Sequence, residues 1–213
     1  MASRSPLKEE LIVQLRRTIP VSLSHLMRRS LDVMSVAVLG HIGKDVLAAG
    51  ALAQSTVNTV ALSVLVGLSS ATVTLTSQAV GAGDRLQTGL WLHRALVVSF
   101  LTALPITVLL SFLAPILKAV GQKPELADIA GGYCAWLLPG IWAWAVTWAV
   151  NPWLQAHGIV KPSMYCAIIV ACIHPFLLAL LVYGLSFGPY GAAMAGSLSL
   201  INNAALLTLP ESF

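Results

Sequence analysis

The chain has 213 residues, of which 57% are hydrophobic and only 9% are charged, and its formal net charge is +4. A soluble domain carries about 25% charged residues, so this composition excludes a water-soluble globular protein. The small, scattered positive charge gives no reason to expect a nucleic-acid partner. Because long apolar runs recur from end to end, we expect one all-α integral membrane domain embedded in the lipid bilayer.

Six apolar runs supply the roughly 20 residues that a membrane-crossing helix needs. In chain order they are Thr18–Leu39, Val46–Leu75, Ala95–Leu117, Ile129–Val150, Met164–Leu185 and Gly191–Leu209. Runs this long and continuous differ from the alternating strands of about 10 residues that form a membrane barrel. We therefore predict a six-transmembrane-helix bundle over residues 18–209, with a cytoplasmic N-terminal tail at 1–17 and a C-terminal stub at 210–213.

The lysines and arginines outside the first run predict the orientation, because basic residues are enriched on the cytoplasmic side. Three of them, Lys44, Lys118 and Lys123, fall on the side opposite the N-terminus. The N-terminal side holds seven, namely Arg4, Lys8, Arg16, Arg17, Arg85, Arg94 and Lys161. We therefore expect a multi-pass protein with both termini in the cytoplasm, in a plasma membrane or a vacuolar-type membrane.

The first run carries three charged residues, Arg28, Arg29 and Asp32, in its middle. Each costs about 2.5–3.5 kcal/mol at the centre of a membrane helix, whereas a Leu, Ile or Val returns only about 0.3–0.6 kcal/mol. The nine such residues between Ile19 and Leu39 do not offset three charges that face lipid. At about 100° per residue, the charges share an arc of roughly 140° with other polar residues. These are Ser24, His25 and Ser35.

This polar stripe, from Ser24 to Ser35, has two interpretations. Asp32 follows Arg28 by four residues and Arg29 by three, so either arginine can form an internal ion pair that closes a gap between helices. Alternatively, the stripe lines a water-filled cavity, because ionisable residues inside a membrane mark ion and substrate pathways. The second interpretation makes Arg28, Arg29, Asp32 and Ser35 candidate pathway residues.

Residues of later runs extend this candidate pathway. Gln54 and Asn58 lie one turn apart in the second run and are candidates for lining a cavity, although most polar residues in membrane helices join one helix to another. Trp144 lies near the middle of the fourth run, where the aromatic belts at the membrane surfaces do not reach. It serves either packing or the binding of flat organic cations by cation–π attraction.

The cysteines give no sign of a metal centre or of a disulfide framework. Cys134, Cys166 and Cys172 have spacings that match neither, and we interpret them as small core residues. No other group of residues predicts a metal site or a catalytic centre. We therefore expect no metal and no enzymatic activity.

Six stretches of the chain resemble the multidrug and toxic compound extrusion (MATE) family in its eukaryotic form. They are, in order, "VAVLGHIGKDVLAAGALA", "LTSQAVGAGD", "GQKPELADIAGGY", "LLPGIWAW", "NPWLQAHGIVKPSMY" and "GPYGAAMAGSLS". Each is weak alone, but together they agree with the family in order and spacing over most of the chain. The motif positions to which we assign most weight are Gly40, His41, Gly43, Gln78, Gly81, Ala82, Gln155 and Pro162.

The resemblance implies that the chain is the N-terminal lobe of a fold in which two six-helix lobes surround a central cavity. It implies export of organic cations, or of other amphiphilic xenobiotics and metabolites, by antiport with protons or sodium ions and with no other cofactor. Bacterial members have an aspartate in the first helix that aligns with Ser35, and eukaryotic members have their proton-linked glutamate in the second lobe. Transport would therefore need a second lobe or a homodimer partner.

Two alternatives to an exporter remain open. The chain can be a truncated, non-transporting membrane protein or an assembly subunit, since only one lobe is present. It can also be a lipid-linked sugar flippase of the same superfamily. The stretches "QAVGAGD" and "LQAHGIVKP" favour the multidrug exporter over the flippase.

Overall fold

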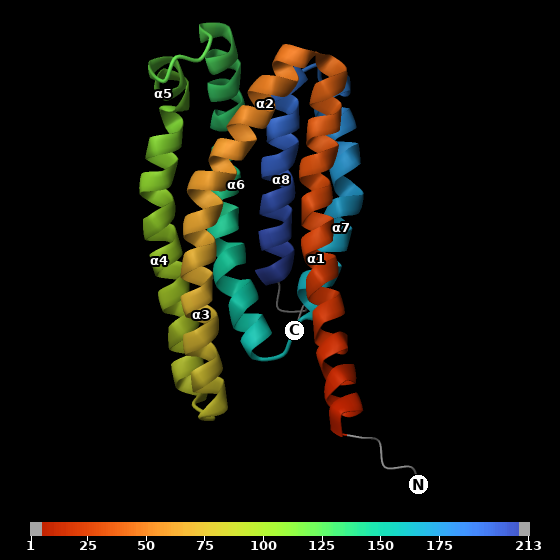
Figure 1. Cartoon of the computed structure of the whole chain (residues 1–213), viewed down its shortest axis with the longest axis vertical. Helices are drawn as coiled ribbons and strands as arrows, with labels where there is room; N and C mark the ends of the chain where they lie inside the picture. Colours follow the sequence, from red (N-terminus) through yellow and green to blue (C-terminus); the bar gives the residue numbers. More distant parts are fainter. Residues whose placement is uncertain (1–5, 209–213) are drawn as a thin grey trace.

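The computed structural model describes the backbone of residues 6–208 and the side chains of residues 10–16 and 18–208. Throughout this part of the chain the regular structure is helical, without a strand, and Figure 1 shows the long helices side by side along one axis. The prediction of an all-α protein is confirmed. The elements are α1 (Pro6–Ile42), α2 (Lys44–Val57), the π-helical segment η1 (Asn58–Leu62), α3 (Ser63–Gly81), α4 (Arg85–Ser111), α5 (Leu113–Ala119), α6 (Pro124–Ala156), α7 (Lys161–Leu178), the π-helical segment η2 (Ala179–Gly184) and α8 (Gly188–Thr208).

The turn between α3 and α4 shows how local chemistry ends these helices. Gly83 has a φ of +72°, a left-handed conformation that glycine adopts without a side-chain clash. Its N–H donates to the Val80 carbonyl and that of Asp84 donates to Ala79, both at 3.1 Å, so carbonyls at the end of α3 are satisfied. The Asp84 carboxylate then accepts from the Gln87 N–H at 2.9 Å and caps α4.

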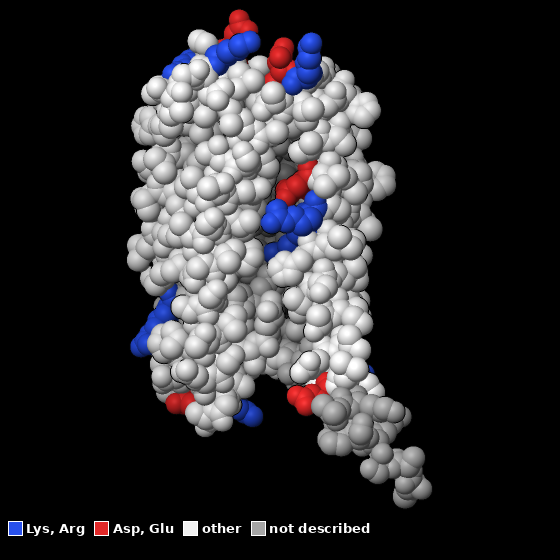
Figure 2. All heavy atoms as spheres, viewed as in Figure 1, with Lys and Arg blue, Asp and Glu red and all other residues white. Residues whose placement is uncertain are grey.

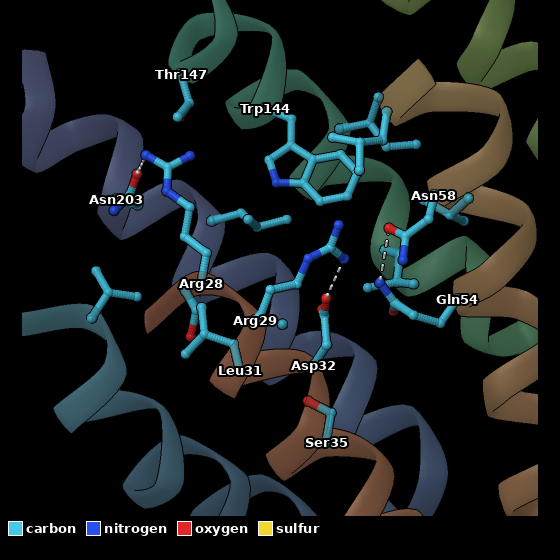
Figure 3. Close-up of a pocket in the computed structure, with 18 of the residues that line it drawn as sticks. Arg28, Arg29, Leu31, Asp32, Ser35, Gln54, Asn58, Trp144, Thr147 and Asn203 are labelled. Carbon is cyan, nitrogen blue, oxygen red and sulfur yellow. Dashed lines mark hydrogen bonds and ion pairs between the residues drawn. The ribbon is translucent and has the colours of Figure 1, made fainter. Parts of the chain in front are cut away.

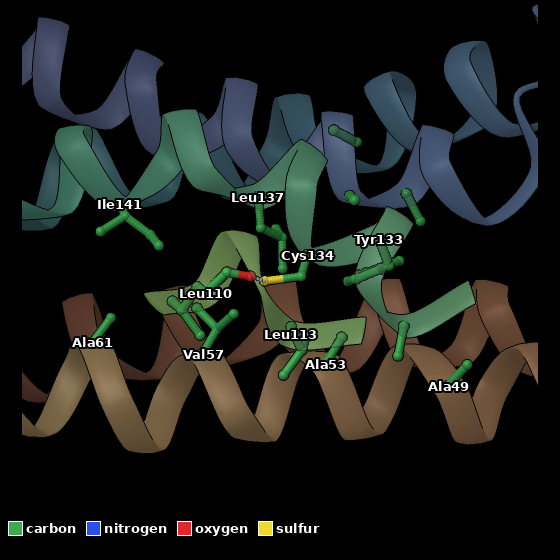
Figure 4. Close-up of a cluster of buried hydrophobic side chains, with 14 of the residues drawn as sticks. Ala49, Ala53, Val57, Ala61, Leu110, Leu113, Tyr133, Cys134, Leu137 and Ile141 are labelled. Atoms are coloured by element: carbon green, nitrogen blue, oxygen red, sulfur yellow. Dashed lines mark hydrogen bonds between the residues drawn. The ribbon is translucent and has the colours of Figure 1, made fainter. Parts of the chain in front are cut away.

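The centre of the lobe is α6, which packs against α2, α3, α4, α5 and α8. Small residues permit this crowding, since Ala127, Ala130 and Ala145 of α6 are fully buried. Figure 4 shows α6 facing the buried alanines of α2 and η1 across Leu110 and Leu113. A Cβ at Gly140 of α6 would lie 3.2 Å from the Ser197 Cα of α8, so a side chain there would push the two helices apart.

Within residues 6–208, four helical segments are long and apolar enough to cross a membrane. They are Lys44–Gly81, Arg85–Ser111, Pro124–Ala156 and Lys161–Gly184. Neither α1 nor α8 is among them, so length and composition do not establish the predicted count of six crossings. Each of these two helices nevertheless runs alongside the others in Figure 1. The protein is an integral membrane protein, as its composition predicted.

The structure corrects two of the predicted boundaries. The predicted span Ala95–Leu117 crosses a break, because α4 ends at Ser111 and the short helix α5 begins at Leu113. Between them, the backbone at Phe112 (φ −96°, ψ 19°) leaves the α-helical conformation.

The predicted tail at 1–17 is not separate from the first helix, because α1 begins at Pro6. Its 37 residues give a helix of about 55 Å, longer than a membrane's apolar core. The predicted stub at 210–213 lies outside the described residues.

The surface has the distribution of charge that a lipid-facing bundle requires. Figure 2 shows Lys, Arg, Asp and Glu gathered mainly at the two ends of the molecule, with a largely uncharged band between them that holds a charged group at mid-height and one basic side chain on the left. Large apolar side chains are exposed within that band, among them Val33, Leu101 and Phe176. Because apolar side chains at these depths contact acyl chains rather than water, their exposure has no solvation cost in a bilayer.

We predict that the α1–α2 and α5–α6 turns face away from the cytoplasm and that the α3–α4 turn faces it. Figure 1 places the first two turns at one end of the bundle and the third at the other, in keeping with the predicted basic bias. In a cysteine-free background, Lys44→Cys and Lys123→Cys should react with a membrane-impermeant maleimide applied from the non-cytoplasmic side. Arg85→Cys should react only after the membrane is permeabilised. The opposite labelling pattern would reverse the orientation.

Candidate functional site

A cavity of about 190 Å³ lies at mid-height in the bundle. Its wall includes side chains of α1, the α2–η1–α3 segment, α6, α7 and α8. It forms between α6 and α1, because α1 packs on α2, α7 and α8 but makes few contacts with α6 itself. Figure 2 shows a hollow at this height, with acidic and basic side chains visible inside it.

The cavity wall contains all seven residues that the sequence proposed for a substrate or ion pathway. They are Arg28, Arg29, Asp32, Ser35, Gln54, Asn58 and Trp144. Four come from one face of α1, two from the α2–η1 junction and one from α6. Figure 3 shows most of them pointing into a common space. Their transport role stays a prediction, but tertiary structure does bring them together.

The two arginines of the polar stripe have different partners. Arg29 Nη1 lies 3.4 Å from Asp32 Oδ2, and Arg28 Nη2 donates instead to Asn203 Oδ1 of α8, also at 3.4 Å. The sequence allowed either arginine to pair with Asp32, and the structure selects Arg29. The side chain of Arg29 is 65% exposed and that of Asp32 is 34% exposed. An ion pair this open to solvent contributes little to stability, which argues against its role being purely structural.

Gln54 and Asn58 form the wall opposite α1 (Figure 3). The Gln54 Nε2 group donates to Asn58 Oδ1 at 3.4 Å, across one helical turn. Asn58 is also the first residue of the π-helical segment η1. Such segments often occur at functional sites because they change the direction in which side chains point.

The tryptophans of α6 divide between packing and the cavity. Trp144 and Trp148 line the cavity, whereas Trp142 stacks on Phe100 of α4 with ring centroids 5.9 Å apart. In Figure 3 the Trp144 indole projects between Arg28 and the Gln54–Asn58 pair. The Trp148 Nε1 atom is buried and has no hydrogen-bond acceptor among the described residues. An unused donor therefore belongs to the cavity wall.

A buried histidine in the cavity wall is hydrogen-bonded to two other helices. His174 of α7 is fully buried; its Nε2 lies 3.1 Å from Ser35 Oγ of α1 and its Nδ1 lies 2.8 Å from Ser199 Oγ of α8. A neutral imidazole has one donor and one acceptor nitrogen, so one serine donates to the ring and the other accepts from it. This network joins three helices and satisfies both ring nitrogens.

Sequence reasoning missed three of the polar residues that complete the wall. His174 was not identified, although a histidine within the apolar run before Pro175 was a signal that could have singled it out. Asn203 and Ser199 were not distinguished from the other polar residues of the apolar runs. Their proximity to α1 could not be read from the sequence, because 139 residues separate Ser35 from His174 and 175 separate Arg28 from Asn203.

The eight family-motif positions lie at helix ends and are not among the residues lining the cavity. Gly40, His41 and Gly43 surround the α1–α2 junction, and Gln78, Gly81 and Ala82 end α3. The remaining two, Gln155 and Pro162, flank the α6–α7 turn. Among the described residues, these eight positions lie in or beside the turns of the bundle and do not line the cavity.

The part of the chain that the structure describes contains no group of three or more His, Cys, Asp or Glu side chains placed to hold a metal ion. The arrangement instead combines charged, amide and hydroxyl groups with two indoles and several aliphatic side chains. Such a mixture binds and orients a small amphiphilic molecule.

We predict that His174→Leu lowers the thermal stability of the protein. The leucine fills similar space but leaves two buried serine hydroxyls without a partner, at about 1–3 kcal/mol each. The unfolding temperature of the purified protein should therefore fall, and should largely recover when Ser35→Ala and Ser199→Ala are added. Cys172→Leu, at an exposed position of the same helix, should change it little. An unchanged unfolding temperature in His174→Leu would show that the network does not stabilise the bundle.

Comparison with known proteins identifies relatives of this chain in both sequence and fold. The family model described as MatE matches residues 20–180. Protein DETOXIFICATION 16 and Protein DETOXIFICATION 17, both of Arabidopsis thaliana, are 32% and 33% identical to the chain over 97% of its length. The crystal structure of the eukaryotic MATE transporter AtDTX14 superposes on 93% of the chain with a TM-score of 0.84 and 30% identity.

The chain spans less than half the length of these relatives. It covers 43% of each of the two Arabidopsis proteins and 46% of the AtDTX14 chain. The likeness therefore concerns one half of a larger architecture.

Proposed function

The chain belongs to the MatE family, as its six sequence stretches predicted, and from this premise we propose that it forms one lobe of a secondary active transporter. In this proposal the protein exports small organic molecules across a membrane in exchange for protons or sodium ions. It is a transporter and not an enzyme, in keeping with a family whose members are transporters.

The observation that carries this proposal is the cavity at mid-height. Ionisable side chains within a membrane protein are costly and are kept where they serve a pathway. Here Arg28, Arg29 and Asp32 all line one cavity together with amide, hydroxyl and indole groups. Substrate sites of secondary transporters lie near the bilayer midplane between repeats, which is the depth of this cavity in the bundle.

In this proposal, different residues of the wall contribute different interactions with the substrate and the coupling ion. Trp144 and Leu137 offer apolar surface to the body of a substrate, while Gln54 and Asn58 offer donors and acceptors that orient it. The Arg29–Asp32 pair can open and close without losing much energy, since it is exposed to the cavity. A pair of this kind can respond to a coupling cation that competes with Arg29 for the carboxylate.

We further propose that transport requires a second lobe. Alternating access works by rocking one bundle against another around a fixed site, and this chain corresponds to less than half of its relatives. The second lobe comes either from another copy of the chain or from additional sequence. The match to the MatE model over residues 20–180 favours this function over a lipid-linked sugar flippase.

We predict that Asp32→Asn abolishes transport without preventing membrane insertion. The test uses proteoliposomes containing both lobes, a proton or sodium gradient, and two fluorescent amphiphiles of opposite charge, ethidium and fluorescein. Gradient-driven movement of at least one dye should fall more than tenfold in Asp32→Asn. It should stay normal in Asp45→Asn, an exposed acidic residue at the start of α2.

Replacing Arg28, Arg29 and Asp32 together by leucine separates transport from a structural role. If the charges serve only to pair with one another, the triple variant should be stable and active, because a buried ion network is often replaceable by apolar residues. A transport role predicts a stable but inactive triple variant. Normal efflux by Asp32→Asn would contradict the proposed role of this carboxylate.

We also predict that two lobes meet through the side on which the cavity opens. Val66 of α3 lines the cavity and is exposed, whereas Leu101 of α4 is exposed outside it. In membranes containing only this chain in a cysteine-free background, Val66→Cys should form a cross-linked dimer and Leu101→Cys should not. Equal cross-linking of both, or of neither, would favour a non-transporting fragment or subunit.

A further inference from the structure

The charged groups of the cavity do not balance. Arg28 and Arg29 contribute two positive charges and Asp32 contributes one negative charge, so the wall carries a net charge of +1 with its histidines neutral. This sign is unexpected for a site that binds organic cations, because a ligand cation would face an excess of like charge in a poorly solvated space. An organic anion would instead bring the site to neutrality.

Arg28 is the source of the excess. Asp32, the acidic residue of the wall, is paired with Arg29, and Arg28 has no carboxylate within 4 Å among the described side chains. Its partner there is the neutral amide of Asn203 at 3.4 Å, a long contact that leaves its guanidinium donors largely available. A guanidinium presents a planar fork that matches both oxygens of a carboxylate.

The rest of the wall limits the body of the ligand. Trp144, Leu137, Ile141 and Val170 give an apolar surface with one flat aromatic face. The volume of about 190 Å³ lies below the range of about 300–1,000 Å³ that is usual for ligand pockets. In this lobe the space suits a compact aromatic ring system.

We propose that the cavity selects a small aromatic carboxylate, with the carboxylate held by Arg28 beside Asn203 and the ring packed on Trp144. The proposal rests on the proposed function, since it names the substrate class of the same cavity. In it, Asp32 reduces the affinity for the anion by holding Arg29 and by its own negative charge.

Three probes with one ring system and different head groups test this selection. They are 2-naphthoate, 2-naphthylmethylammonium and 2-naphthylmethanol, measured at neutral pH by equilibrium dialysis against the full chain in phosphatidylcholine nanodiscs. Empty nanodiscs correct for partition into lipid. We expect naphthoate to bind at least tenfold more tightly than the ammonium probe, with the alcohol between them.

Variants of the wall identify the groups responsible. Arg28→Gln should weaken naphthoate binding at least tenfold and change the affinity for the alcohol less than twofold. Arg94→Gln removes an arginine that lies over the Trp91 ring, outside the cavity, and should change neither. Asp32→Asn should bind naphthoate several-fold more tightly than the unmodified protein, a gain that misfolding cannot produce. If Arg28→Gln fails to fold, Arg28→Lys should retain a preference for naphthoate.

Each contrary result has a distinct meaning. Tighter or equal binding of the ammonium probe, or unchanged naphthoate binding in Arg28→Gln, would overturn the anion selection but leave the cavity as a substrate site. Failure of all three probes to bind would overturn both the anion selection and the proposed function of the cavity. A loss of naphthoate binding in Asp32→Asn would also contradict the role given to Asp32.

Discussion

The high free-energy cost of placing three charged side chains within an apolar bundle governs the arrangement of this lobe. Ile19, Leu26 and Val33 are exposed on the outer surface of α1, and their spacing of seven residues places them on one stripe of the helix. The face with Arg28, Arg29 and Asp32 therefore turns inward. A cavity lined by these side chains remains where α1 lies apart from α6.

The bundle accommodates its inward-facing polar groups in two different ways. Ser35, His174 and Ser199 are buried and hydrogen-bonded to one another across three helices. Arg29 and Asp32 are open to the cavity and contact each other only at 3.4 Å. The first arrangement fixes how α1 packs on α7 and α8, whereas the second leaves charged groups free to exchange partners.

Close packing joins the helices of the lobe. A Cβ at Gly191 of α8 would lie 2.7 Å from the Leu181 carbonyl oxygen, so these backbones are in direct contact, and α6 faces buried side chains of α2 and η1 (Figure 4). Membrane helices associate through such close contacts because lipid provides no hydrophobic driving force between them. The polar cavity therefore interrupts an otherwise close-packed unit.

The sequence by itself determined the class of the protein, most of its helices and the inward direction of the polar stripe. These follow from local properties, namely the length of apolar runs, turn residues such as Gly83, and the periodicity that places Arg28 and Asp32 on one face of a helix. The family membership was also evident from short motifs, although those motifs form turns and not the cavity. The seven candidate pathway residues, whose role stays a prediction, line one cavity, and all but Trp144 stand out in the sequence as polar groups in an apolar chain.

Only the tertiary structure decided which groups meet. It paired Asp32 with Arg29 and left Arg28 to Asn203, it placed His174 between two serines, and it ended α4 at Ser111 within a continuous apolar run. It also separated Trp142, which packs on Phe100, from Trp144 and Trp148, which line the cavity. Hydropathy and periodicity describe one helix at a time, whereas these choices depend on contacts between helices distant in sequence, and the net charge of the cavity is set by those contacts.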